Sequence, residues 1–315
     1  DNALVAKINK IVTRRFLKFL AEQAKKDAEA YNDFFKTFGV FLKEGVVTDF
    51  THREELAPLL RFESSRTKPG ELTSLAEYCE RMPEGQKEIY YISAPNREAA
   101  ESGPYVETFK ERDLEIIYTL DPIDDFVFSH LGEFQGKKLV SADRADLELP
   151  DTGKKKDDNT GAEGEGLSAA EASALIGWIK TVLGDRVKEV KESKRLVGSP
   201  AIVVNPDGFI TSSMERIMRA AHTDTPPASK KNLEINCRHP LIRGLAQAKD
   251  EDEPFARRIV EQILDNAMIQ AGLAVDPRAM AQRNYAILEE AVRRRPVADH
   301  AEPPEAKAKM ETAAN

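Results

Sequence analysis

The first 50 residues carry apolar side chains at intervals of three and four positions, which is the period of an amphipathic helix. We expect one long helix over residues 4–30, followed by a second helical stretch rich in phenylalanine. The pattern Thr51-His52-Arg53-Glu54 fits a capping box, in which the end residues each satisfy a backbone N–H, and it predicts a further short helix. The apolar positions of the first two stretches are Leu4, Ile8, Ile11, Val12, Phe16, Phe19, Leu20, Ala24, Tyr31, Phe34, Phe35, Phe38, Phe41 and Leu42.

The period changes in the following hundred residues. Residues 88–93 and 114–120 are short runs rich in β-branched and aromatic side chains, so each predicts a strand. Residues 96–112 between them predict a helix interrupted near Gly103, and residues 121–134 predict another helix. A βαβ unit of this size implies a small parallel sheet covered by helices, and so a three-layer αβα subdomain.

Residues 150–166 form the clearest boundary, because they are rich in Gly, Lys, Asp and Glu and contain no large apolar residue. Such a segment buries too little surface to offset its ordering entropy, so it predicts a flexible linker between domains 1–149 and 167–295. The tail, 296–315, is rich in Pro, Ala and charged residues and predicts disorder.

The second domain also mixes helices and strands, which makes the fold class α+β (mixed α/β). Ser168 and Glu171 form a second capping-box pattern, which opens a helix that ends at Gly184. The later elements are predicted as strands near 186–196 and 200–205, a helix near 212–221, the segment 233–236, a short helix after His239, a helix from Pro254 to Gly272, and a last helix from Asp276 to about Arg295.

Composition limits the possible partners. The 315 residues are 41% hydrophobic and 32% charged, with a net charge of −8, which predicts a soluble protein and argues against nucleic acid as a partner. No apolar run approaches the roughly 18 residues of a membrane span, so no membrane partner is expected. The two cysteines, Cys79 and Cys237, are far apart and are expected to be reduced thiols rather than zinc ligands.

Motifs for catalysis are absent from the sequence. The chain has no GxxxxGK[ST] or GxGxxG loop for phosphate and no HExxH or GxSxG motif. The five histidines are scattered, so each is interpreted as a surface or structural histidine rather than a metal ligand. We therefore expect no catalytic residue, no metal site and no bound cofactor in this chain, although an enzyme with an unrecognised site stays open as an alternative.

Several segments, in order and at matching spacing from Leu4 to Arg295, resemble the ninety-kilodalton heat-shock protein family of chaperones. The resemblance is to its bacterial (HtpG-like) or mitochondrial form. The segments are Leu59–Ser65 (LLRFESS), Leu72–Tyr78 (LTSLAEY), Arg81-Met82, Ile89–Ile92 (IYYI), Ser102–Glu107 (SGPYVE, similar to an SPYLE-type element), Leu233–Asn236 (LEIN) and His239–Ile242 (HPLI).

The resemblance implies a longer parent protein. Family members begin with an ATP-binding domain, and an arginine that contacts the ATP γ-phosphate would lie just upstream of Asp1. The chain then corresponds to the latter part of the middle domain and the dimerisation domain, with ATP and Mg bound only in the full-length parent. The tail lacks the MEEVD ending that docks tetratricopeptide-repeat cochaperones. A bacterial cytoplasmic location is implied, with the mitochondrial matrix as the alternative.

Two segments are candidates for binding unfolded or partly folded client proteins. Around residues 209–218, apolar side chains recur on one helical face, and Ser212 with Glu215 fits a capping box. The stripe could instead pack on its own domain, but the resemblance favours client contact. On the helix after Asp121, the family carries an acid–tryptophan pair where this chain has Asp125 and Phe126. The alternative is that Phe126 and Phe128 divide between core and surface. The candidate residues are Asp125, Phe126, Ser129, Phe209, Ile210, Met214, Ile217 and Met218.

The last two helices predict a homodimer. Their apolar faces are wider than a domain of this size readily hides, so we expect helices from two copies to form a four-helix bundle. Packing within one domain is the alternative, and a dimeric scaffold or adaptor without chaperone activity is the alternative function. The candidate interface residues are Phe255, Ile259, Ile263, Leu264, Ala267, Met268, Met280, Asn284, Ile287, Leu288 and Ala291.

Overall fold

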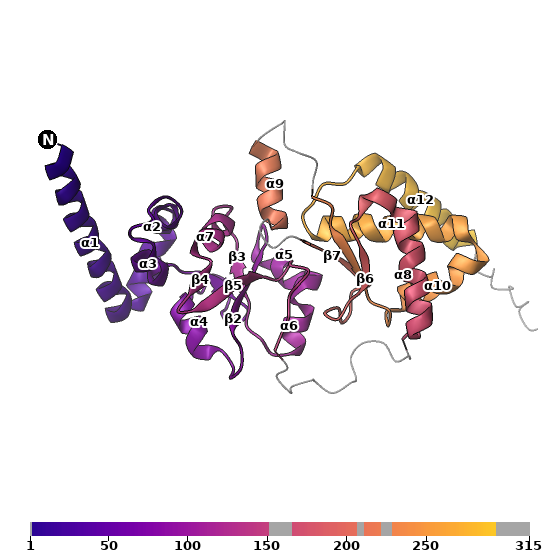
Figure 1. The fold of residues 1–315 in the computed structure, drawn as a ribbon, viewed down its shortest axis with the longest axis horizontal. Helices are drawn as coiled ribbons and strands as arrows, with labels where there is room; N and C mark the ends of the chain where they lie inside the picture. The colour runs from indigo at the N-terminus through magenta and orange to yellow at the C-terminus, as the bar shows by residue number, and fades with distance from the viewer. Residues whose placement is uncertain (1, 151–165, 207–210, 222–228, 294–315) are drawn as a thin grey trace, which may run out of the picture.

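A computed structural model describes residues 2–150, 166–206, 211–221 and 229–293 (Figure 1). The predicted linker and tail fall almost entirely outside these ranges. The helical elements are α1 (Asn2–Lys26), α2 (Ala28–Thr48), α3 (Arg53–Leu56), η1 (Ala57–Leu59), α4 (Leu75–Arg81), α5 (Arg97–Ser102), η2 (Pro104–Val106), α6 (Glu107–Glu111), α7 (Asp124–Leu131), α8 (Ala169–Leu183), η3 (Gly184–Arg186), α9 (Ser212–Ala221), α10 (Pro240–Glu251), α11 (Glu253–Gln270) and α12 (Pro277–Arg293).

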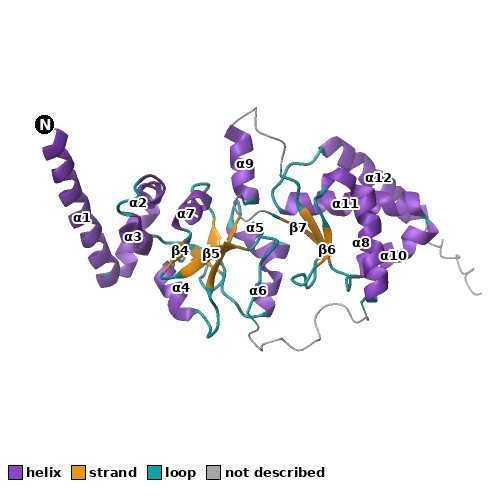
Figure 2. Cartoon of the chain, in the orientation of Figure 1, coloured by secondary structure: helices purple, strands orange, loops and turns teal. Residues whose placement is uncertain are grey.

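The strands form two sheets, which Figure 2 shows in orange among the helices. The first has the order β1-β3-β2-β5-β4 and the second the order β6-β8-β7. The strands are β1 (Glu63–Ser64), β2 (Glu88–Ser93), β3 (Ile117–Thr119), β4 (Glu133–Phe134), β5 (Lys137–Ser141), β6 (Val190–Glu192), β7 (Ala201–Val204) and β8 (Asn232–Ile235).

The N-terminal helices correct one expectation. The single helix predicted over residues 4–30 is two helices, because the Asp27 carboxylate accepts the Ala30 N–H at 3.0 Å and caps the start of α2. In Figure 1, α1 projects from the body of the molecule, and only its C-terminal part lies near α2. Leu17 and Leu20 are its buried apolar residues, whereas Phe16 and Phe19 are half exposed.

The capping box predicted at Thr51–Glu54 is also wrong. The carboxylate of Asp49 accepts the backbone N–H groups of Thr51 and His52, at 2.9 and 3.3 Å, and contacts the His52 ring at 2.7 Å. The helix α3 then begins at Arg53 without a side-chain cap. Asp49 takes the place of the predicted cap, because an aspartate side chain readily accepts the backbone N–H groups two and three residues further along the chain.

The first sheet forms the middle layer of three, as predicted. Strand β2 pairs in parallel with β3 and β5, while the short edge strands β1 and β4 pair antiparallel. Ile89 and Tyr91 point to the face covered by α2, α4 and α7, and Tyr90 and Ile92 point to the face covered by α5, η2 and α6. The alternation follows from the two-residue period of a strand.

The second half is built around the smaller sheet. The capping box at Ser168 and Glu171 is confirmed at the start of α8. The strands expected over 186–196 and 200–205 are shorter, being β6 and β7, and β8 lies between them. The helices α8, α10 and α11 cover this sheet with a shared apolar core. Helix α11 ends before Gly272, whose φ of +70° suits glycine.

The two halves share an apolar core and a set of hydrogen bonds. Ile202 and Val204 of β7 pack into the core cluster behind the first sheet, beside Tyr90 and Phe109. The Glu107 carboxylate accepts the backbone N–H groups of residues 197–199 at 2.9–3.2 Å. Sheet and helix elements from both sides of the predicted linker are therefore packed together.

Candidate functional site

Helix α7 brings the predicted Asp125, Phe126 and Ser129 into three different environments. Asp125 is 1% exposed, Phe126 is half-buried and Ser129 is exposed. Phe128 is buried, with its ring centroid 5.0 Å from that of Phe62, so the division of the two phenylalanines between core and surface is confirmed. Of the three candidates, Asp125 is not accessible to a partner.

The Asp125 carboxylate faces inward, toward the start of α9. Its Oδ1 accepts hydrogen bonds from the hydroxyl of Ser93 at 2.5 Å and from that of Thr211 at 3.1 Å. Burial raises the pKa of Asp125 above its ordinary value, although hydrogen bonds from Ser213, Ser93 and Thr211 oppose this rise. Sequence reasoning could not find this contact, because its partner Thr211 follows 86 residues later.

The next carboxylate back along α7 ties this helix to α2. Asp124 lies 2.7 Å from the ammonium of Lys43, which is itself buried and also contacts Asp121 at 2.5 Å. Burial raises the pKa of Asp124 to about 6, against the effect of Lys43. Two adjacent carboxylates in the first turn of α7 thus serve two different neighbours.

Helix α9 carries the other predicted client-binding residues. Phe209 and Ile210 lie outside the described residues. Met214 and Ile217 are half-buried, and Met218 is 42% exposed. The helix therefore presents part of its methionine-bearing face on the surface of the single chain.

The predicted capping box of Ser212 and Glu215 is not formed. The hydroxyl of Thr211 accepts the Met214 N–H at 3.0 Å and caps the helix. Glu215 instead lies 2.5 Å from the buried ammonium of Lys231, at the entrance to β8. An unpaired buried ammonium costs more free energy than a missing second cap at a helix N-terminus, so Glu215 pairs with Lys231.

Helix α11 packs its predicted interface residues mainly into its own domain. Ile263, Leu264 and Ala267 are at most 7% exposed and belong to the core around the second sheet. Phe255, Ile259 and Met268 are half-buried. The role of these residues in an interface between copies stays a prediction.

Helix α12 differs, because none of its residues is buried. Met280 and Ile287 are half-buried, while Asn284, Leu288 and Ala291 are exposed. The sequence interpretation missed Tyr285 and Val292, which are 69% and 73% exposed. Both share a helical face with Leu288 at offsets of three and four residues, so the same periodicity could have found them.

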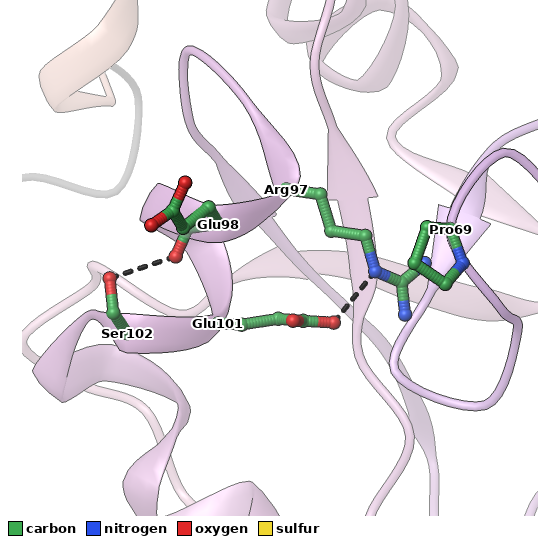
Figure 3. Close-up of a pocket in the computed structure, with 5 residues that line it drawn as sticks. All are labelled: Pro69, Arg97, Glu98, Glu101 and Ser102. Atoms are coloured by element: carbon green, nitrogen blue, oxygen red, sulfur yellow. Dashed lines mark hydrogen bonds and ion pairs between the residues drawn. The ribbon is translucent and has the colours of Figure 1, made fainter.

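A pocket lies beside α5 and is lined by Pro69, Arg97, Glu98, Glu101 and Ser102 (Figure 3). The Arg97 guanidinium contacts Glu101 at 2.7 Å and Glu63 at 2.8 Å, so its charge is already compensated. In the described part of the chain, no three His, Cys, Asp or Glu side chains are placed to hold a metal ion.

The cysteines are free in the structure, as expected. Burial raises the pKa of Cys237 to about 11 and raises that of Cys79 as well. Among the described residues, no helix combines the length and apolarity that crossing a membrane requires.

Comparison with known proteins identifies the family. The model of the Hsp90 protein family matches residues 1–315, so the chain belongs to the Hsp90 family of chaperones. It is 52% identical over 298 residues to the "Chaperone protein HtpG" of Desulfotalea psychrophila, covering 93% of this chain and 47% of that protein. The corresponding protein of Desulfitobacterium hafniense is 49% identical over 293 residues, with the same two coverages.

A mitochondrial relative is also similar. The "Heat shock protein 75 kDa, mitochondrial" of Rattus norvegicus is 39% identical over 298 residues, which are 93% of this chain and 42% of that protein. The chain thus spans about half the length of the curated relatives that it matches. The resemblance inferred from short motifs is confirmed.

Proposed function

We propose that this chain is the client-binding and dimerising half of an Hsp90 chaperone, and that it performs no reaction itself. In the full-length parent, ATP and Mg²⁺ would be bound by the part upstream of this chain. Two findings support this reading: the relatives are named as chaperones, and the chain covers 47% of their length. The same names favour the bacterial cytoplasm as its location, with the mitochondrial matrix as the alternative.

The observation that carries the proposal is the uncovered face of α12. Tyr285, Leu288 and Val292 together expose a strip of large apolar side chains on a helix in which no residue is fully buried in its own chain. Such a strip is costly in water and commonly marks an interface between copies. Arg283 fixes the opposite side of α12 to α11 through Asp265 at 2.5 Å and Glu261 at 2.9 Å. The exposed strip is therefore held facing outward.

A second copy is the partner that this strip fits. Two α12 helices related by a two-fold axis would cover each other's apolar strip, and the adjoining parts of α11 would complete a four-helix bundle. Half-buried Phe255, Ile259 and Met268 lie on α11, where such a bundle could bury them further. The dimer would bring the two upstream ATPase domains to a high effective concentration.

Client binding is assigned to α9 and to the exposed part of α7. Met214, Ile217 and Met218 offer flexible, polarizable side chains, and Phe126 adds a half-buried aromatic ring. These properties suit partners that share no sequence, such as unfolded chains. The missing tryptophan at position 126 removes an indole N–H donor but leaves apolar contact possible.

An aggregation assay tests the chaperone function. The chain should slow the light scattering of a thermally denatured protein in proportion to the chain added, and Met218→Ser should weaken this effect. Leu241→Ser on α10, whose side chain has a similar exposure of 40%, is the matched control and should have no effect. A dimeric chain without any suppression would favour the scaffold or adaptor instead.

A further inference from the structure

The start of α9 is held by side chains from the first half of the molecule. The Thr211 hydroxyl donates to Asp125 of α7 at 3.1 Å, and the Ser212 N–H donates to Asp143, just after β5, at 2.9 Å. Thr211 and Ser212 are 9% and 6% exposed. Two successive residues at the N-terminus of α9 thus each bond to a carboxylate of the preceding half.

Both carboxylates are buried and surrounded by donors. Asp125 is 1% and Asp143 is 4% exposed. Asp143 also accepts the hydroxyl of Ser141 and the side-chain amide of Asn205, both at 2.6 Å. A buried carboxylate is costly unless hydrogen bonds satisfy it, and the positive end of the α9 dipole adds a further favourable term. The two carboxylates therefore have all of these partners only when α9 lies in this position.

The same helix is attached to the second half one turn later. The Lys231 ammonium, which is 3% exposed, contacts Glu215 at 2.5 Å and the side-chain oxygen of Asn205 at 2.6 Å. Asn205 in turn donates to Asp143. A continuous polar network therefore joins the two halves through the base of α9, which Figure 1 shows between them.

We propose that Asp125 and Asp143 are positioning residues, which fix the base of α9 and thereby determine how its methionine-bearing face is presented to a client. Asp125 acts on client binding through Thr211, without touching the client. This inference rests on the client-binding role of α9, but the anchoring itself can be measured separately. It also replaces the direct contact that the sequence predicted for Asp125.

Hydrogen exchange of the full chain tests the anchoring. Asp125→Asn keeps the shape but removes the charge, and Thr211→Val removes the hydroxyl. We expect Asp125→Asn to speed exchange of the amides of residues 215–218 about tenfold, as fits the loss of a hydrogen bond to a charged group. Thr211→Val should speed it at least as much, because it also removes the cap on the Met214 N–H. Thr211→Ser retains the hydroxyl and should restore the wild-type rate. Ser93→Ala removes the donor to Asp125 that lies outside α9 and its cap, and it should leave α9 within about twofold of the wild-type rate.

Two further measurements separate anchoring from unfolding and from client binding. Amides of α11 should exchange as in the wild type, because α11 belongs to the separate core of the second half. Affinity for reduced, carboxymethylated α-lactalbumin should fall about tenfold in Asp125→Asn and Thr211→Val, and recover in Thr211→Ser.

Each outcome has a distinct meaning. Faster α9 exchange together with weaker binding supports the inference. Unchanged α9 exchange in both Asp125→Asn and Thr211→Val overturns it. Faster exchange with unchanged affinity keeps the anchor but removes α9 as the client-binding surface, which contradicts the proposed function instead.

Discussion

Helices α11 and α12 are consecutive and both carry an apolar stripe, yet they treat it differently. In α11 the stripe is buried, with Leu264 at 2% and Val260 at 0% exposure. In α12 the stripe faces outward, with Leu288 at 53% exposure. Helical periodicity thus shows that one face of a helix is apolar. Whether that face belongs to the core or is open to a partner depends on whether the helix's own domain covers it.

The largest difference should appear in the stability of the single chain. Leu264→Ala leaves a cavity in the core and should lower the free energy of unfolding by about 2–5 kcal/mol. Leu288→Ala, at low protein concentration, should change it by less than about 0.5 kcal/mol. Urea denaturation at two concentrations measures both. The Leu288 effect should grow with concentration, because dimerisation stabilises the folded state by mass action; equal effects at low concentration would show that the two helices do not differ.

A charge on the exposed strip should separate the copies. Leu288→Glu places a carboxylate in the proposed apolar interface and should raise the dimer Kd at least thirtyfold, which corresponds to about 2 kcal/mol. Sedimentation equilibrium measures the change. Leu241→Glu, at the exposed leucine of α10, is the control and should leave the Kd unaltered. A matching loss of dimer in the control would mean that α12 is not the specific contact.

The attachment between α11 and α12 should matter more than exposed ion pairs on α12. Arg283→Met leaves the buried Asp265 with fewer partners and should cost about 1–3 kcal/mol of stability. Arg293→Met removes a side chain that is 72% exposed and should cost at most about 0.5 kcal/mol. Thermal denaturation compares them. Indistinguishable melting temperatures would argue that α12 is not fixed by Arg283.

The smallest expected effect concerns cysteine reactivity, which tests whether the apolar core packed against α11 is closed to solvent. Cys237 is 3% exposed and its pKa is raised to about 11, so it should form little thiolate at about pH 8. Cys79 is more accessible and should react first with a thiol reagent, as peptide mass spectrometry would show. Prior labelling of Cys237 would indicate that this core opens readily.

Local patterns predicted much of the fold. Strand β2 was predicted with its observed bounds, and α12 within one residue of its observed start, because each has a clear period and a clear boundary residue. The two-residue strands β1 and β4 are too short to show any period. The break at Asp27 was missed because the apolar period continues across it, although an aspartate can cap a new helix.

The candidate site depended more on distant contacts. The apolar face of α12 follows from spacing, and Tyr285 and Val292 could have been included, but spacing could not predict that Tyr285, Leu288 and Val292 are exposed. The burial of Asp125 could not be predicted, since it depends on Thr211 arriving from the other half of the chain. The Lys231–Glu215 pair, which replaces the expected capping box, is likewise set by the packing of β8 beside α9.

The claim that a second copy covers α12 is tested most directly by the mass in solution. Light scattering of the purified chain at micromolar concentration should give twice the 35.1 kDa of one chain, and Leu288→Glu should return it toward 35.1 kDa. A wild-type mass of 35.1 kDa across the micromolar range would contradict the account, because the exposed strip of Tyr285, Leu288 and Val292 would then have no partner of its own kind.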